Sequence, residues 1–74
     1  IRYGLPDDAE VTLMIYDIAG RLVNTVVKSR QSAGWHQVEW NGTNSHGQPL
    51  GTGVYFCRLV AGDYSHTIKM VYLK

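Results

Sequence analysis

The sequence predicts an all-β fold, a small sandwich of five to seven antiparallel strands. Several segments alternate apolar and polar residues, clusters of Gly, Pro, Asn and Asp separate them, and no window has the spacing of a helix. A hydrophobic content of 45% is too high for a disordered chain. With 74 residues the core is thin, and a closed barrel is not expected because the chain is too short to fill one.

The first two strands are predicted near the N-terminus. Residues 1–3 form a short edge strand, because Pro6 follows and cannot donate a hydrogen bond to a ladder. Residues 11–17 alternate, so that Val11, Leu13 and Ile15 share one face.

A hairpin and a third long strand follow. Residues 17–21, with Gly at position 20, are a short link to a strand over 22–28. Residues 35–40 form the next strand, after a polar stretch. One face of that strand carries His36, Val38 and Trp40.

The C-terminal part is predicted to be a long loop followed by a second hairpin. Residues 41–53 contain four glycines and a proline, with a tight turn at Asn41-Gly42. The strand over 54–60 faces inward with Tyr55, Cys57 and Leu59. A turn over 61–63 leads to a last strand that runs from Tyr64 to the final residue and carries Ile68, Met70 and Tyr72 on one face. The predicted core is Val11, Leu13, Ile15, Val38, Trp40, Tyr55, Leu59 and Met70.

Charge and hydropathy exclude several classes of partner. The formal net charge is +1 and charged residues are 18% of the chain, so neither nucleic acid binding nor an acidic or basic surface is indicated. No apolar run approaches the roughly 18 residues of a membrane span, and no membrane insertion is expected. A single cysteine excludes an internal disulfide.

Catalysis, metal binding and cofactors are not expected. His36, His46, His66 and Cys57 follow no zinc-site spacing. Most of the acidic residues lie at turns, there is no nucleophile elbow, and the small domain has little depth to exclude water from a reaction. The loop over 41–53 offers neutral oxygens but no carboxylate for calcium. Its Asn41-Gly42-Thr43 sequon is equally well explained as a turn.

Six blocks in order resemble a known family. They are Ile1-x-Tyr3-x-Leu5-Pro6, Val11-x-Leu13-x-Ile15-Tyr16-Asp17-x-x-Gly20-Arg21-x-Val23, Gly34-x-His36-x-Val38-x-Trp40-Asn41-Gly42, Gly47-x-Pro49, Gly53-Val54-Tyr55-Phe56-x-Arg58-Leu59-x-Ala61-Gly62 and Lys69-Met70-Val71-x-Leu73-Lys74. The chain resembles the type A C-terminal sorting domain of the type IX secretion system, and in pattern the Ig-like domain of the flagellar hook-capping protein. It departs at Asn41, where Asp is commoner, and at Cys57, where an aromatic residue is usual.

The resemblance implies a non-catalytic Ig-like sandwich of about six to seven strands. Residues 1–74 would be one sorting and anchoring domain at the end of a larger secreted protein, whose other part precedes Ile1. Its partners would be the secretion and surface-attachment machinery, and its location secreted or at the cell surface, after passage through the periplasm and outer membrane. The residues carried over for recognition are Lys69, Met70, Val71, Leu73 and Lys74.

Recognition by β-augmentation is a physical mechanism for such a signal, because a terminal strand presents unpaired backbone groups. The alternative is that the last strand only holds the core. Two other functions stay open. One is a structural Ig-like spacer or a subunit that self-associates through edge strands. The other is a carbohydrate-binding module, for which Trp35, beside Gly34 at a strand start, is the aromatic residue most free to be exposed.

Overall fold

The computed structural model describes all residues, 1–74, and contains six strands in two antiparallel sheets. The strands are β1 (Arg2–Leu5), β2 (Ala9–Tyr16), β3 (Leu22–Gln31), β4 (Gly34–Gln37), β5 (Gly53–Ala61) and β6 (Tyr64–Tyr72). The larger sheet has the order β3-β2-β5-β6, and the smaller sheet pairs β1 with β4. The predicted all-β, Ig-like sandwich of about six to seven strands is therefore confirmed.

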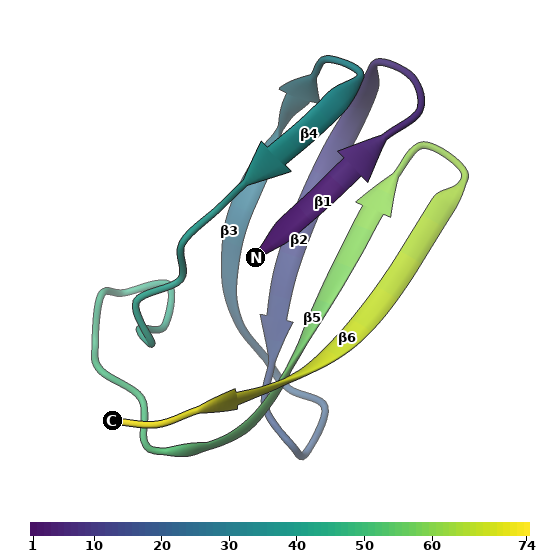
Figure 1. The fold of residues 1–74 in the computed structure, drawn as a ribbon. Coiled ribbons are helices and arrows are strands. Elements are labelled where there is room, and N and C mark those ends of the chain that lie inside the picture. The colour runs from purple at the N-terminus through teal and green to yellow at the C-terminus, as the bar shows by residue number, and fades with distance from the viewer.

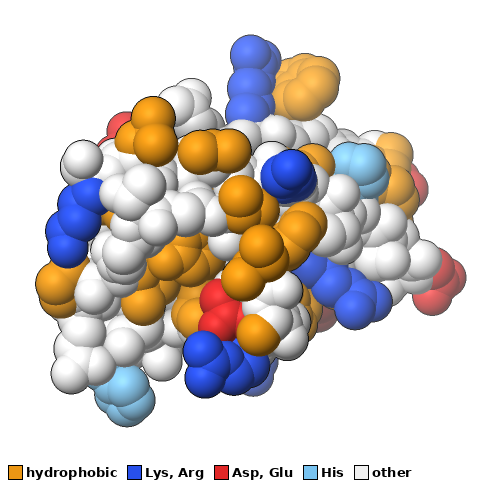
Figure 2. Space-filling view, turned by 90° about the horizontal axis from the view of Figure 1, so that it is seen from below, with side chains coloured by type: hydrophobic (Ala, Val, Ile, Leu, Met, Phe, Trp, Pro, Cys, Tyr) orange, Lys and Arg blue, Asp and Glu red, His pale blue; other side chains and the backbone are white.

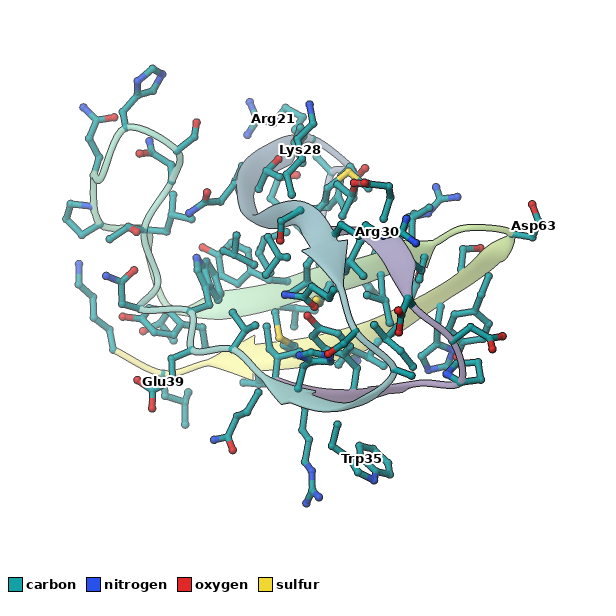
Figure 3. The ribbon with its side chains drawn as sticks, turned by 90° about the horizontal axis from the view of Figure 1, so that it is seen from above. Arg21, Lys28, Arg30, Trp35, Glu39 and Asp63 are labelled. Atoms are coloured by element: carbon teal, nitrogen blue, oxygen red, sulfur yellow. The ribbon has the colours of Figure 1, made fainter.

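The smaller sheet covers only part of the larger one. In Figure 1, β4 and β1 lie in front of β3 and β2, whereas β5 and β6 extend beyond them. Figure 3 shows the two outer faces, with Lys28 and Arg30 of β3 on the side of the molecule away from Trp35 of β4. The inner side of β6 consequently has no strand of the smaller sheet over it.

Alternating residues of the two central strands form the core between the sheets. The buried residues of β2 and β5 are Val11, Leu13, Ile15, Tyr55, Cys57, Leu59 and Ala61. They include five of the predicted core residues and the predicted inward face of the strand over 54–60. From the smaller sheet, Tyr3 and Leu5 of β1 add to this core. Val38, Trp40 and Met70 are only partly buried and pack against it, which corrects the expectation that they belong to it.

Two predicted strands end earlier than expected. The strand expected over 35–40 is β4, which ends at Gln37. Its partner β1 begins at Arg2, opposite Gln37, and beyond this pair only Ile1 and Val38 still exchange backbone hydrogen bonds. The strand expected to reach Lys74 ends at Tyr72, where its partner β5 begins at Gly53. A strand persists only where a neighbour accepts and donates its backbone hydrogen bonds.

The tight turn in the long loop is also displaced from its predicted position. It lies at Asn44 to Gly47, where the Gly47 N–H donates to the Asn44 carbonyl oxygen at 3.0 Å and Gly47 has a φ of 77°. A bridge between Thr43 and Pro49 closes this turn. Gly42 also has a positive φ, of 74°, and it packs against Tyr72, the last residue of β6.

Candidate interaction surface

The β6 strand is an edge of the larger sheet with an open ladder. It pairs with β5 over its whole length, from Gly53↔Tyr72 to Ala61↔Tyr64, without a register shift. No other backbone hydrogen bond in the protein involves β6. A row of its N–H and C=O groups therefore faces outward without a protein partner, as strand addition requires.

Two of the predicted recognition residues lie on the outer face of β6. Lys69 pairs across the sheet with Phe56, and Val71 pairs with Val54. Both are exposed, and Val71 keeps 65% of its surface accessible. A cation and an apolar side chain thus stand two positions apart on the same face, beside the open ladder.

The other three predicted residues have different surroundings. Met70 faces inward, opposite Tyr55, and packs against the core. Leu73 and Lys74 follow the end of β6, where Leu73 is 77% exposed and the Lys74 backbone N–H donates to Thr52 Oγ1 at 2.9 Å. The five residues therefore do not form one cluster, and Met70 packs against the core on the face opposite Lys69 and Val71, as the alternation of the strand predicts.

Three aromatic rings hold the C-terminal end of β6. The ring centre of Trp40 lies 5.1 Å from that of Tyr55 and 5.5 Å from that of Tyr72. The Trp40 Nε1–H donates to the Thr43 carbonyl oxygen at 2.9 Å. A Cβ at Gly42 would overlap the Tyr72 ring, so this glycine is required for the contact. Sequence analysis put Tyr72 on the inner face beside Met70 but did not identify this cluster.

A shallow groove adjoins the aromatic cluster. It measures about 380 Å³, and its lining is mainly apolar, from Ile1, Trp40, Met70, Val71 and Tyr72. Viewed from the end that carries the β2–β3 turn and the C-terminus, hydrophobic side chains are exposed in several places, among basic, acidic and polar ones (Figure 2). Val71, which lines the groove, and Leu73, two residues later, are exposed apolar residues at the C-terminal end of β6. Exposed apolar residues beside an apolar groove are typical of protein contact surfaces.

The histidines and the cysteine stand apart from one another. The His36 ring stacks on Tyr3, with its Nε2 2.7 Å from the Ser32 carbonyl oxygen, and the His66 ring stacks on Tyr64. No group of three or more His, Cys, Asp or Glu side chains is close enough together to hold a metal ion. Cys57 is buried, and desolvation raises the pKa of its thiol, which disfavours the reactive thiolate.

The turn between β2 and β3 holds the clearest charged contact. Asp17 Oδ1 accepts hydrogen bonds from the backbone N–H groups of Arg21 at 3.0 Å and Ala19 at 2.9 Å, and Oδ2 pairs with Arg21 Nε at 3.0 Å. These donors, above all the Arg21 backbone N–H, hold the pKa of Asp17 below its usual value. These contacts stabilise the turn of the hairpin and do not create a reactive group.

Trp35 lies on the outer face of the smaller sheet. It is 71% exposed, which confirms the expectation from its place beside Gly34. Its ring packs over Gly4, the residue opposite on β1, where a Cβ would stand only 3.1 Å from the ring. The guanidinium carbon of Arg2 lies 4.8 Å from the ring centre, within the range of a cation–π contact.

Comparison with known proteins gives one match. No curated protein and no solved structure matches the chain. The structure contains no helix that is long and apolar enough to cross a membrane. Residues 1–71 match the family described as FlgD Ig-like domain. Because the match extends over nearly the whole chain, and because the fold is the expected sandwich, this chain belongs to the FlgD Ig-like domain family.

Proposed function

We propose that this domain is a non-catalytic C-terminal module that directs the secretion and cell-surface attachment of a larger protein through the type IX system. In this proposal the export and attachment machinery recognises β6 and the residues that follow it. The domain acts as a sorting signal for the protein that carries it and catalyses no reaction.

The observation that carries the proposal is the open edge of β6. Its backbone groups have no partner, and its outer face presents Lys69 and the exposed Val71. Main-chain hydrogen bonds supply affinity in strand addition, while alternate side chains supply specificity. The resemblance of the six sequence blocks to type A sorting domains supports the same strand as the recognised part.

Export of a fusion protein tests the proposal. Residues 1–74 are attached to a reporter in a type IX-competent cell, and Val71→Lys is compared with Leu22→Lys. Both positions are exposed apolar residues on the outer face of the same sheet, at opposite edges. We expect Val71→Lys to abolish most of the export and Leu22→Lys to leave it unchanged. Failure of the unaltered fusion to be exported would contradict the proposed function, and normal export of a folded Val71→Lys fusion would contradict recognition through β6.

This pair of variants is sharper than deletion of residues 72–74. Tyr72 belongs to the aromatic cluster, so its removal would also disturb the fold. Val71 is exposed and its replacement leaves that cluster intact. Circular dichroism of each purified domain checks that both variants remain folded.

A second candidate function is an assembly module. The matched family is described as the Ig-like domain of FlgD and not as a sorting domain, and the open ladder of β6 leaves room for a second copy of this chain. Sedimentation of the isolated domain decides between the two. If the domain sediments as a monomer at high concentration and the fusion is exported, the sorting function is favoured over the assembly module.

A further inference from the structure

The inner face of β6 is less covered than that of its neighbour β5. Cys57 and Leu59 of β5 are buried, whereas the residues opposite them on β6, Ile68 and His66, are exposed. Ile68 keeps 39% of its surface accessible. The cause is the narrow second sheet, which lies over β2 and β3 and does not reach β6 (Figure 1). The inner face of the larger sheet is therefore uncovered at β6.

A small hollow marks the uncovered region. It measures about 50 Å³ and opens between β1 and β6. Its lining is mainly apolar and comes from both sheets, with Ile1 and Tyr3 from the N-terminal segment, Leu59 from β5, and His66 and Ile68 from β6. In a strand added beside β6, every second side chain would point to the inner face of the sheet. The side chain opposite Ile68 would lie next to this hollow.

The backbone of β6 is suited to such an addition. It has nine residues, contains no proline and shows no register irregularity against β5. Every strand pair of this sheet is antiparallel. The added strand would continue that pattern on the free edge.

The charges of this edge identify the chemistry of the added strand. The β6 strand contains Lys69 and His66 but no acidic residue, and Arg58 of β5 stands on the same outer face as Lys69. Opposite charges across a strand pair stabilise the pairing, and like charges weaken it. A carboxylate opposite Lys69 is therefore favoured.

A second copy of this chain fits the same edge less well. If two β6 strands paired antiparallel about Ile68, Lys69 of each copy would face Thr67 of the other. Both Lys69 side chains would then lie on one face as diagonal neighbours without a carboxylate between them. Charge thus favours a different protein as the occupant.

We infer that β6 accepts an extended strand of a partner protein whose side chains alternate between apolar residues toward the sandwich interior and, on the outer side, an acidic residue opposite Lys69. This inference rests on the proposed role of β6 in recognition. It adds to that role the direction, the alternation and the charge of the strand that is bound.

Binding of synthetic peptides tests the inference. A nine-residue peptide is designed for antiparallel pairing with β6, with apolar residues opposite His66, Ile68, Met70 and Tyr72, Val opposite Val71 and Glu opposite Lys69. The matched control has Lys in place of Glu. We expect calorimetry at low salt to show about fivefold tighter binding of the Glu peptide. The preference should reverse with the Lys69→Glu domain.

Main-chain recognition has its own control. Methylation of the peptide N–H groups that face β6 should abolish binding, and the unmodified peptide should protect alternate backbone amides of β6 from hydrogen exchange. Equal binding of the Glu and Lys peptides would overturn the inference. So would dimerisation of the domain through β6, since a second copy would then be the occupant.

The peptide assay and the export assay fail independently. If Val71→Lys blocks export while the Glu and Lys peptides bind equally, the inferred chemistry of the partner is wrong and the proposed function stands. If the Glu peptide binds preferentially while the unaltered fusion is not exported, the strand site stands and the proposed function is wrong.

Discussion

The two edge strands of the larger sheet, β3 and β6, differ in how their free backbone groups are protected. The pairing of β3 with β2 has two register irregularities, between Leu13 and Met14 and between Ile15 and Tyr16. Its outer face carries Lys28 and Arg30. Bulges and charged side chains both discourage the addition of another strand. The β6 strand has no irregularity, and its outer face carries one cation, Lys69, followed by the apolar Val71.

The long loop adds a second protection to β3. The Ser45 N–H donates to the Val23 carbonyl oxygen at 3.0 Å, and Asn24 Nδ2 donates to the Thr43 carbonyl oxygen at 2.8 Å. Nothing equivalent covers β6. In the larger sheet, bulges, charged side chains and the long loop thus protect the β3 edge, whereas the β6 edge is open. The open edge is therefore a feature of β6 and not a general consequence of the small size of the domain.

The largest expected effect comes from the cluster that holds β6 in place. Trp40→Ala should lower the free energy of unfolding by about 2 to 5 kcal/mol, because it removes the ring contacts with Tyr55 and Tyr72. Chemical denaturation measures the loss, and hydrogen exchange should rise first at the C-terminal end of β6.

The second tryptophan is the matched control for this change. Trp35→Ala removes an exposed ring and its contact with Arg2, and should cost at most about 1 kcal/mol. An equal cost for the two variants would mean that the aromatic cluster does not anchor β6.

A smaller effect is expected from opening the protected edge. Asn24→Ala removes the hydrogen bond to the Thr43 carbonyl oxygen and should cost about 1 kcal/mol. Amide exchange of Ser45 should accelerate while that of β6 stays constant. Unchanged exchange at Ser45 would show that the side chain of Asn24 does not hold the loop on β3.

Exchanging the character of the two edges should change association with little effect on stability. Val71→Lys gives β6 an additional charge, and Lys28→Val removes one from β3; each should alter the free energy of unfolding by no more than about 0.5 kcal/mol. Calorimetry should show weaker binding of the Glu peptide to Val71→Lys, whose added charge stands opposite the Val of the peptide. Light scattering at high protein concentration measures the self-association of Lys28→Val. For Lys28→Val we expect no increase, because the bulges and the loop still protect β3. An increase in the self-association of Lys28→Val would show that the charge of Lys28 protects β3 more than the bulges and the loop do.

The smallest effect concerns the turn that joins β2 to β3. Because the folded protein lowers the pKa of Asp17, the ionised carboxylate contributes stability above its unfolded pKa, and this contribution is lost as the pH falls through the lower folded value. Asp17→Asn should therefore flatten the decline of stability below about pH 4. Denaturant unfolding between neutral and strongly acidic pH measures it. An unchanged decline would show that Asp17 does not account for it.

Local alternation in the sequence predicted the central strands well. Val11, Leu13 and Ile15 of β2, and Tyr55, Cys57 and Leu59 of β5, are buried on one face as their spacing indicates. Spacing was a poorer guide at strand ends. The strands β4 and β6 stop at Gln37 and Tyr72 because their partners stop, and a partner lies far away in the chain.

The candidate surface was predicted in part. The sequence placed recognition on residues of the last strand and put Met70 in the predicted core, but only the structure shows that Val71 is exposed and that Met70 is half-buried. Gly42 was expected at a tight turn because it follows Asn41. Its structural reason is the ring of Tyr72, which comes from a segment thirty residues later and leaves no local signal.

The sequence by itself determined the fold class, the approximate number of strands and which face of each central strand is buried, because the alternation of apolar and polar residues is visible within a few neighbouring positions. The tertiary structure alone decided which strands are edges and which edge is open. That depends on hydrogen bonds between distant segments, such as Ser45 with Val23, and on a second sheet too narrow to cover β6. The open edge, on which both proposals rest, is a property of this arrangement and of no single stretch of residues.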